Sequence, residues 1–431
     1  MKLTEAEEFK LSAFLIEGGK KLSGSIAVQG AKNSVLPILA ATILTGGISV
    51  IHNCPQLTDV DASIAILRHL GCEVCRDGED ITVDSAPMNR YDVPDRLMRE
   101  MRSSVVFLGA VLGRMGCAEL SMPGGCELGP RPIDLHLAAL KSMGADVDGQ
   151  GGSLNCCCQA LQGQEIVLSI ASVGATENIM LAACCAEGTT VISNAAREPE
   201  IVDLQRFLRA AGADIAGAGS STVVIRGRRP LHEVEHTIIA DRIVAATYLS
   251  AAAAAGGEVE LTGVDRCCML PVLEVYRMAG CEIHTWPDRI EMCCPHQLKG
   301  VRPIRTAPYP GFPTDAQPPV LAALAMADGT SVFVETIFEN RFRHAGELLR
   351  MGADIRVEGR VAVVCGVEQL LGAAVHSPDL RGGAALVVAA LGAEGSSKVT
   401  GLSHIDRGYS RLEQDFTRLG AKIRRVNEKQ S

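Results

Sequence analysis

The sequence predicts an α/β protein with two domains, each built from three repeated units of about 70 residues whose buried helices pack inward. The chain has 431 residues, and one hydrophobic core rarely extends beyond roughly 250–300 residues. Hydrophobic residues make up 47% and charged residues 21% of the chain, which suits buried cores and argues against a disordered or fibrous protein. A five-residue pattern also returns six times.

The repeated pattern is an apolar residue, glycine, a small residue, usually an acidic residue, and then Val or Ile. Its glycines are 73, 68, 68, 72 and 68 residues apart, and they are Gly71, Gly144, Gly212, Gly280, Gly352 and Gly420. A helix-like segment precedes the pattern, as Val60, Ile64 and Leu67 illustrate at i, i+4 and i+7. We expect the glycine to end that helix in a left-handed conformation and the following residues to begin a strand.

A second helix-like segment, rich in Ala and apolar on nearly every side, lies upstream in each unit and is typical of a buried helix. These segments are 32–44, 102–115, 175–186, 243–255, 317–327 and 381–393. Each unit is therefore predicted to run strand, buried helix, strand, amphipathic helix and strand pair. The midpoint falls in 226–240, where Arg228, Arg229, Pro230 and a polar run indicate a linker between the domains.

Composition excludes several classes of partner. Aromatic residues are only 3% and the net charge is −9, which argues against nucleic-acid and anionic-membrane surfaces. The longest apolar stretch, 243–255, is too short to span a bilayer, and the polar start of the chain is unlike a signal peptide. We expect a cytoplasmic protein with neither nucleic acid nor membrane as partner.

The sixteen cysteines are mostly adjacent in sequence, which suits neither a disulfide framework nor a metal site. We interpret most of them as reduced thiols packed as small apolar residues. No metal and no cofactor are expected, because no cluster of ligands is visible.

Cations recur at predicted helix starts. Lys32 and Asn33 open the first buried helix, where a lysine beside free backbone N–H groups makes either an anion site or a plain helix start with an exposed side chain. The arginines at or just before helix starts are Arg102, Arg131, Arg341, Arg381 and Arg407. A single arginine is usually a surface ion-pair partner, but recurrence at equivalent points of a repeat favours one cleft for a small polyanionic substrate.

Two loops rich in Gly and Pro carry further candidates. The loop 122–132 holds Cys126 close to Arg131 and to a helix start, and both features favour a reactive thiolate on a lid-like segment. The loop 306–315 ends at Asp315, which serves either as the cap of the helix beginning near Ala316 or as a general base.

Together these segments resemble the UDP-N-acetylglucosamine enolpyruvyl transferases, in the family's order over nearly the whole chain. The matching segments are 30–33, 123–135, 172–176, 195–203, 312–315, 338–342, 379–381 and 404–409. The Pro-Gly-Gly-Cys loop and the run Arg-Glu-Pro-Glu-Ile-Val-Asp are the most specific. The resemblance implies a two-domain inside-out α/β barrel, with 32–239 carrying the Cys126 lid, 1–31 plus 240–431 carrying Asp315, and the active site in the cleft between them.

The resemblance further implies transfer of enolpyruvyl from phosphoenolpyruvate to the 3′-hydroxyl of UDP-N-acetylglucosamine, with release of phosphate through a tetrahedral ketal. In the family this is the first committed step of peptidoglycan synthesis. By similarity, Cys126 protonates C3 of phosphoenolpyruvate, can form a covalent adduct and is the target of fosfomycin. Asp315 takes the proton of the sugar hydroxyl.

Contacts to both substrates carry over by similarity. Those to phosphoenolpyruvate are Lys32, Asn33, Arg131, Arg381 and Arg407, with Lys32 and Arg407 counted as catalytic. Those to the nucleotide sugar are Arg102, Arg131, Pro132, Ile133, Asp134, Leu135, Ser172, Val173, Gly174, Asp315 and Ile337. Two positions depart from the family pattern: Ile170 stands where some members carry Lys, and Val244 where some carry Glu.

Two rival functions stay open. A 5-enolpyruvylshikimate-3-phosphate synthase shares fold and co-substrate but lacks the cysteine lid, so Cys126 argues against it. A non-catalytic paralogue that only binds nucleotide sugar is the other, and the presence of Cys126, Asp315 and Lys32 argues against that role.

Overall fold

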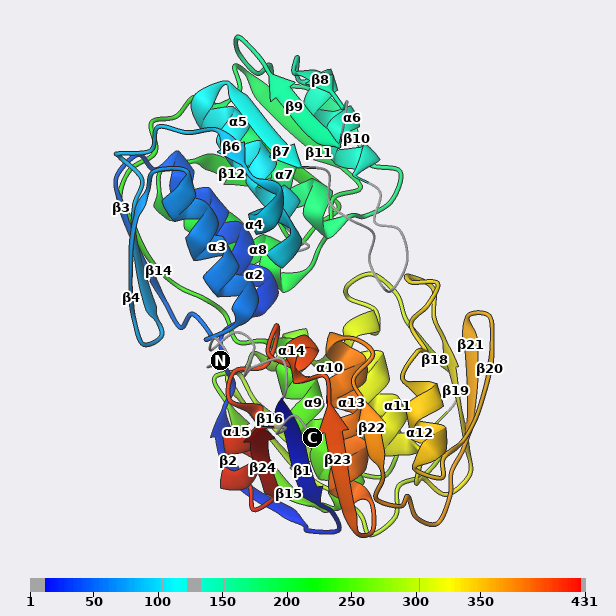
Figure 1. Cartoon of the computed structure of the whole chain (residues 1–431). Coiled ribbons are helices and arrows are strands. Elements are labelled where there is room, and N and C mark those ends of the chain that lie inside the picture. The colour runs from blue at the N-terminus through cyan, green and yellow to red at the C-terminus, as the bar shows by residue number, and fades with distance from the viewer. Residues whose placement is uncertain (1–11, 102–103, 122–132, 150–151, 302, 428–431) are drawn as a thin grey trace. The chain divides into compact units, whose positions relative to one another are not determined.

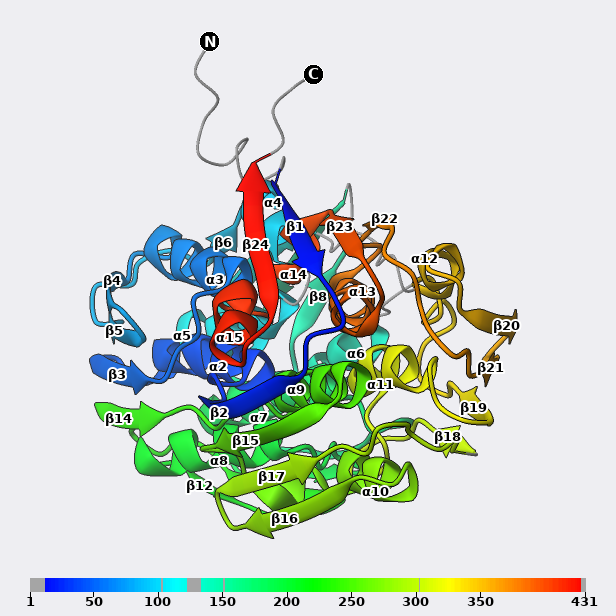
Figure 2. The same cartoon turned by 90° about the horizontal axis from the view of Figure 1, so that it is seen from below.

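The computed structural model describes residues 12–101, 104–121, 133–149, 152–301 and 303–427. They divide into two compact units. Unit 1 holds the described residues of 12–29 and 240–427, and unit 2 holds those of 30–239. Each unit contains three four-stranded sheets (Figures 1 and 2).

The sheets of unit 2 share one topology, in which the first two strands are parallel and the other neighbours antiparallel. In spatial order they are β14 (Val234–Thr237), β3 (Ile48–His52), β5 (Asp80–Asp84) and β4 (Glu73–Asp77); β6 (Asp92–Val93), β7 (Cys117–Ser121), β9 (Ser153–Cys157) and β8 (Asp146–Asp148); and β10 (Glu165–Val167), β11 (Thr189–Ser193), β13 (Thr222–Arg226) and β12 (Asp214–Ala216).

The sheets of unit 1 repeat that topology. They are β2 (Leu22–Ala27), β15 (Gly257–Thr262), β17 (Arg289–Cys293) and β16 (Glu282–Trp286); β18 (Ile304–Arg305), β19 (Thr330–Val334), β21 (Val361–Cys365) and β20 (Asp354–Glu358); and β22 (Ala374–His376), β23 (Ser396–Thr400), β1 (Ser12–Glu17) and β24 (Lys422–Asn427). Six sheets of one topology confirm the predicted α/β fold of six repeated units.

Two kinds of helix alternate with the strands. The buried helices are α2 (Lys32–Ala41), α5 (Phe107–Met115), α7 (Val173–Cys185), α9 (Arg242–Ala255), α11 (Gln317–Leu324) and α13 (Leu380–Gly392). The amphipathic helices are α3 (Thr58–His69), α6 (Asp134–Ser142), α8 (Pro199–Ala210), α10 (Leu270–Met278), α12 (Ala345–Arg350) and α15 (Leu412–Arg418). The short elements are α4 (Asp95–Glu100), α14 (Leu402–Ile405), η1 (Thr42–Leu44), η2 (Ser104–Val106), η3 (Arg266–Cys268) and η4 (Thr314–Ala316).

The glycine of the repeated pattern behaves as predicted. All six copies have positive φ, between 91° and 103°, directly after an amphipathic helix. A residue with a Cβ is strained in that conformation, so glycine allows the chain to leave the helix and enter the next strand within two residues.

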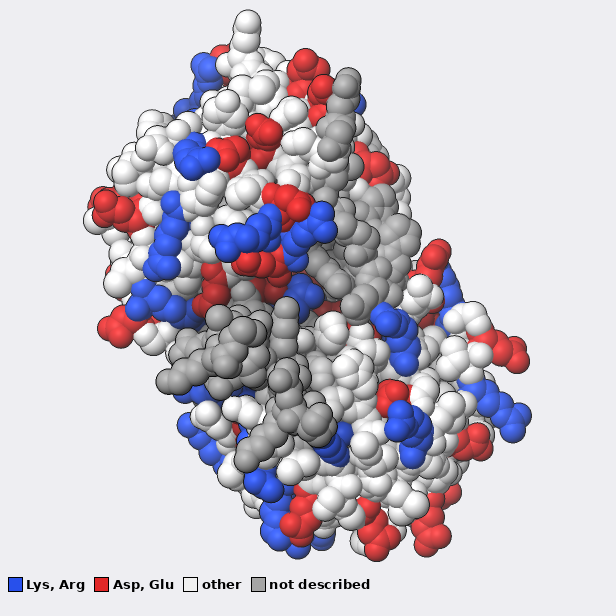
Figure 3. All heavy atoms as spheres, in the orientation of Figure 1, with Lys and Arg blue, Asp and Glu red and all other residues white. Residues whose placement is uncertain are grey.

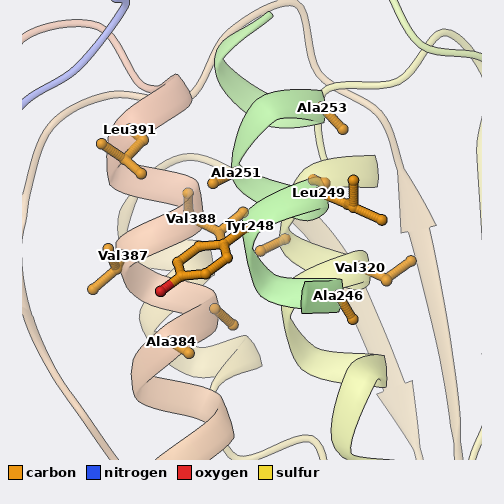
Figure 4. Packing of buried hydrophobic residues seen from close by; sticks show 14 of the residues in the cluster. Ala246, Tyr248, Leu249, Ala251, Ala253, Val320, Ala384, Val387, Val388 and Leu391 are labelled. Atoms are coloured by element: carbon orange, nitrogen blue, oxygen red, sulfur yellow. The ribbon is translucent and has the colours of Figure 1, made fainter. Parts of the chain in front are cut away.

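The buried helices form the centre of each unit. In unit 1, α9, α11 and α13 pack against one another inside the three sheets (Figure 2). Figure 4 shows Tyr248 and Leu249 of α9 among Val320 of α11 and Val387 and Val388 of α13. Many small alanines let these helices approach closely and pack densely. Unit 2 has a separate core of the same kind around α2, α5 and α7.

The predicted linker at 226–240 is only partly correct. Residue 226 ends β13, and β14 occupies Val234–Thr237 as an edge strand paired in parallel with β3. The composition is misleading because an edge strand is held by backbone hydrogen bonds and needs few apolar side chains. After β14 the chain enters α9 of unit 1, whereas β2, which pairs with β15 of unit 1, leads into α2 of unit 2.

Surface charge alone does not reveal a site. On the face shown in Figure 3, basic and acidic side chains are interspersed. Several of the cations singled out by sequence, Lys32, Arg341 and Arg381, are instead buried. Across the part of the chain that the structure describes, none of the helices has the length and apolar character needed to cross a bilayer.

Candidate active site

Asp315 of unit 1 lies in the 3-10 turn η4 and is held by two arginines. One oxygen, Oδ1, accepts a hydrogen bond from Arg341 Nη2 at 2.7 Å, and the other, Oδ2, accepts one from Arg381 Nε at 3.3 Å. The cap interpretation is wrong, because Ala316 occupies the N-cap position of α11 (Gln317–Leu324) and Asp315 lies inside the preceding turn η4. The carboxylate side chain remains 29% exposed and is therefore accessible to a substrate hydroxyl.

Arg341 is the more deeply buried of the two arginines, with a side chain only 1% exposed. Besides Asp315 it donates from Nε and Nη2 to the carbonyl of Thr314, at 3.1 and 3.0 Å. Its guanidinium thus fixes both the backbone and the side chain of the turn that carries the carboxylate. The sequence singled out Arg341 as a cation at a helix start but gave it no role.

Arg381 stands at the beginning of α13. Asp379 caps this helix by accepting from the backbone N–H groups of Arg381 and Gly382, at 3.1 and 2.9 Å. The guanidinium lies over the ring of Tyr409, 5.3 Å from its centre. Burial opposes its charge, but Tyr409 and Asp315 outweigh burial and raise the pKa of Arg381. Its buried Nη1 has no acceptor among the described residues, so this donor is available to an anionic ligand.

Arg407 follows α14 on a turn that Gln29 anchors. The Gln29 amide donates to the carbonyl of Gly408 at 3.2 Å, and its oxygen accepts from the backbone of Ser410 at 2.8 Å. Next to this turn, the hydroxyls of Tyr409 and Thr247 are hydrogen bonded at 2.9 Å. Tyr409 therefore lies under the guanidinium of Arg381 and stands two residues after Arg407 in the chain.

Ile337 also belongs to this region of unit 1. Its backbone N–H donates to Oε1 of Glu335 at 2.7 Å, and Oε2 of the same glutamate accepts from the Thr314 hydroxyl at 3.0 Å. Glu335 itself is buried. This carboxylate ties the Ile337 segment to the turn that carries Asp315, and sequence reasoning did not identify it.

Lys32 of unit 2 opens α2, and its ammonium is 2.7 Å from Oδ2 of Asp59 in α3. The side chains of both residues are nearly inaccessible, at 9% and 2% exposed. The alternative of an exposed lysine at a plain helix start is therefore wrong. The neighbouring Asn33 is exposed. Asp59 is a partner that sequence reasoning missed.

The predicted nucleotide-sugar contacts of unit 2 lie at two helix starts. Ile133 precedes α6, which Asp134 and Leu135 begin, while Ser172 caps α7 by accepting from Ala175 N at 3.3 Å and Val173 and Gly174 follow it. The two starts lie side by side, because a Cβ placed on Gly174 would stand 3.2 Å from a ring carbon of His136 in α6.

His136 is the buried residue that joins these helix starts. Asn178 of α7 donates to its Nδ1 at 2.8 Å, donates also to the carbonyl of Val105, and accepts from the backbone of Gly109. Burial lowers the pKa of His136 to about 4. The ring is therefore neutral at pH 7, and α5, α6 and α7 share one hydrogen-bonded junction.

Four predicted site residues, Arg102, Cys126, Arg131 and Pro132, lie outside the described residues. Within the described ranges, no three His, Cys, Asp or Glu side chains are arranged to hold a metal ion. Unit 1 offers a carboxylate beside a guanidinium N–H that has no acceptor among the described residues. Unit 2 offers an oriented ammonium at the start of α2 and, separately, the two adjoining helix starts of α6 and α7.

The chain is similar to enolpyruvyl transferases in both sequence and fold. The family model described as EPSP synthase (3-phosphoshikimate 1-carboxyvinyltransferase) matches residues 16–416. The crystal structure of the enolpyruvyl transferase NikO from Streptomyces tendae covers 97% of this chain and 99% of its own, with TM-score 0.86 and 28% identity. An EPSP synthase from Acinetobacter baumannii, at TM-score 0.75 and 19% identity over 96% of this chain and all of its own, shares the fold. The chain belongs to this family of enolpyruvyl transferases.

Its sequence relatives are more specific. A protein of Caldanaerobacter subterraneus subsp. tengcongensis named UDP-N-acetylglucosamine 1-carboxyvinyltransferase 2 is 53% identical over 96% of this chain and 100% of its own length. A protein of Symbiobacterium thermophilum named UDP-N-acetylglucosamine 1-carboxyvinyltransferase 1 is 50% identical over 96% of this chain and 95% of its own.

Proposed function

We propose that this protein transfers the enolpyruvyl group of phosphoenolpyruvate to the 3′-hydroxyl of UDP-N-acetylglucosamine and releases phosphate, a reaction of peptidoglycan synthesis. The observation that carries the proposal is the 53% identity, over nearly the whole chain, to a relative named for this activity. The position of Asp315 between two arginines supports it. We place the reaction in the cytoplasm, because both substrates are anions that do not cross a lipid bilayer unaided.

The proposed chemistry is an addition followed by an elimination. Cys126 donates a proton to C3 of phosphoenolpyruvate, which leaves an oxocarbenium-like centre at C2. The sugar oxygen attacks C2 while Asp315 accepts its proton, giving a tetrahedral ketal. Loss of a proton from C3 and of phosphate from C2 restores the double bond in the enol ether. Because Asp315 belongs to unit 1 and the Cys126 loop leaves β7 of unit 2, the proposal requires both units in one catalytic cycle.

The cations have a defined task in this scheme. The phosphate and carboxylate of phosphoenolpyruvate carry charge that changes as the phosphate leaves, and preorganised donors stabilise that charge. We assign this task to Lys32, Asn33, Arg131, Arg381 and Arg407. The unpaired Nη1 of Arg381 supports its assignment, since it can donate to an incoming anion without giving up an existing hydrogen bond.

The nucleotide sugar is assigned to the adjoining helix starts of unit 2 and to the Asp315 region of unit 1. The assigned residues are Arg102, Arg131, Pro132, Ile133, Asp134, Leu135, Ser172, Val173, Gly174, Asp315 and Ile337. Backbone N–H groups at a helix start favour a phosphate group. The contact between His136 and Gly174 supports the assignment because it brings two such starts together.

The identity of the molecule that accepts the enolpyruvyl group distinguishes the proposed function from the two rival functions. Phosphate release is measured with phosphoenolpyruvate and either UDP-N-acetylglucosamine or shikimate 3-phosphate. We expect release with the nucleotide sugar alone. Release with shikimate 3-phosphate alone would identify the shikimate enzyme, and binding of the nucleotide sugar without release would identify a binding protein.

The assignment of Cys126 has its own test, in which fosfomycin labelling is followed by the mass of the intact protein and of its peptides. We expect one label on the native protein and none on Cys126→Ser. Cys157→Ser, which removes an exposed thiol elsewhere, is the matched control and should keep the label. Labelling of Cys126→Ser at another cysteine would remove Cys126 from the proposed role.

A further inference from the structure

The cysteines of the structure are not all explained by packing. Cys54, Cys72, Cys156, Cys184 and Cys281 are buried, as the sequence suggested, but Cys75, Cys157, Cys267 and Cys293 are exposed. Among the exposed thiols, Cys157 at the end of β9 faces a second cysteine across the sheet. Its register partner on β7 is Cys117, which is half-buried.

The backbone places this pair in a geometry suited to a disulfide. The backbone N–H of Cys158 donates to the carbonyl of Gly116 at 2.8 Å, so the next pair along, Cys117 and Cys157, occupies a non-hydrogen-bonded position of the antiparallel ladder. Opposite Cα atoms at such a position are about 4.5 Å apart and their side chains share one face. That separation lies within the range of about 4.4–6.8 Å that disulfides span.

The two thiols also interact directly. A hydrogen bond between the Cys157 and Cys117 side chains raises the pKa of Cys157 to about 11, and burial adds to the effect. The second neighbour of Cys157 across the sheet is Asp146 on β8. The Cys157 thiol therefore remains protonated at pH 7 and donates toward the sulfur of Cys117.

Unit 1 contains a matched pair that differs in accessibility. Glu282 and Cys293 are register partners on β16 and β17, so Cys281 and Cys294 follow as the next opposed pair. The N–H of Cys294 donates to Gly257 on the other side of β17, which leaves this pair non-hydrogen-bonded as well. Their side chains form a hydrogen bond, but Cys281 is buried and Cys294 only half-buried.

We propose that Cys117 and Cys157 form a reversible disulfide when a low-molecular-weight disulfide such as glutathione disulfide is present. One thiolate attacks the oxidant and displaces one glutathione thiolate, and the second protein thiol then displaces the other. Two protein thiols are oxidised to one disulfide, and one glutathione disulfide is reduced to two thiols. The bond would cross-link β7 to β9 on the outer face of their sheet.

The experiment treats the folded full-length protein with glutathione disulfide and maps the products by peptide mass spectrometry. We expect the 117 and 157 peptides to be joined without glutathione, with the loss of two alkylatable thiols and recovery of both after reduction. Cys293 is the internal control, because its register partners are Glu258 and Glu282. It should carry a glutathione adduct instead of a cross-link.

The variant Cys157→Ser separates pairing from mere exposure. Cys117 should then keep a glutathione adduct, because its resolving thiol is gone, while fosfomycin labelling stays unchanged. The buried pair Cys281 and Cys294 should oxidise later than the exposed pair. Stable glutathione adducts on both Cys117 and Cys157, a bond from Cys117 to Cys158, or earlier oxidation of Cys281 and Cys294 would each overturn the assignment.

Discussion

The two units hold charged residues at their helix starts in different ways. In unit 1 one carboxylate, Asp315, is shared by the guanidinium groups of Arg341 and Arg381. In unit 2 the ammonium of Lys32 lies 2.7 Å from the carboxylate of Asp59. Among these residues, the group in unit 1 has two guanidinium groups and one carboxylate, whereas the pair in unit 2 has one ammonium and one carboxylate.

This difference indicates how the Asp315 group and the Lys32–Asp59 pair can each contribute to binding a small anion. The two guanidinium groups of the Asp315 group attract a ligand of negative charge, and the unpaired Nη1 of Arg381 is where it can be bound. The Lys32–Asp59 pair, with one charge of each sign, offers little net attraction, but the carboxylate of Asp59 fixes a lysine side chain that is otherwise flexible. We infer that the Asp315 group of unit 1 supplies electrostatic attraction and that the Lys32–Asp59 pair of unit 2 supplies a precisely placed donor.

The largest expected effect comes from removing the carboxylate of unit 1. Asp315→Ala takes away the proposed base and leaves two buried guanidinium groups without their shared partner. We expect turnover to fall by about 10²–10⁴-fold, the usual contribution of a positioned acid or base, while both substrates still bind. Turnover is measured by phosphate release and binding by calorimetry.

The control for this experiment is Asp315→Asn, which keeps the shape of the side chain and one oxygen acceptor, so that one of the two arginines keeps its hydrogen bond. It should be thermally more stable than Asp315→Ala and as inactive. Near-native turnover of either variant would remove Asp315 from the chemistry. Loss of substrate binding in the Asn variant would limit Asp315 to its assigned contact with the nucleotide sugar.

A smaller effect on catalysis is expected when the Lys32–Asp59 pair of unit 2 is broken. Asp59→Asn removes the charge that orients the Lys32 ammonium, and misplacement of a contacting group typically costs about 10- to 100-fold in kcat/KM. We expect the loss to appear mainly in the KM for phosphoenolpyruvate, with the KM for the nucleotide sugar little changed. Steady-state kinetics with each substrate varied in turn measures both.

Asp61→Asn is the matched control, since Asp61 lies on the same helix α3 but is exposed and pairs with Arg76. It should leave the kinetics unchanged. An unaltered or lower KM in Asp59→Asn would mean that Asp59 competes with the anion for Lys32, which contradicts the positioning role.

The repeat and the positions of the cations at helix starts could be predicted from the sequence, because both depend on short stretches of neighbouring residues. Positions at i, i+4 and i+7, glycines at even spacing and cations before apolar helices all depend on neighbours in the chain. These patterns identified the six units and the helix starts that carry Lys32, Arg381 and Asp315 before any partner was known.

The partners could not be predicted in the same way. Arg341 and Arg381 are 26 and 66 residues from Asp315 along the chain, and nothing local to Asp315 favours one arginine over another. The carboxylate of Asp59 resembled any acidic residue in a first helical turn. The strand β14 could not be predicted from the sequence, because its pairing with β3 uses backbone N–H and C=O groups, which are present in almost every residue.

The smallest effect concerns folding stability at low pH. It depends on whether the buried His136 of unit 2 can take up a proton in the folded protein. Burial lowers the pKa of His136 from an ordinary 6.5 to about 4. Between these values the unfolded chain takes up a proton that the folded one excludes, so stability is complete above pH 6.5 and is lost as pH falls toward 4. The shift corresponds to about 3 kcal/mol.

His136→Gln keeps an acceptor for Asn178 but cannot be protonated. We expect its urea midpoint to fall less steeply than that of the native protein between pH 6.5 and 4, with the two curves parallel above pH 7. His284→Gln is the control, because His284 is exposed and pairs with Glu282 at the surface. Identical pH dependence of the native and His136→Gln proteins would show that the junction of α5, α6 and α7 admits a proton.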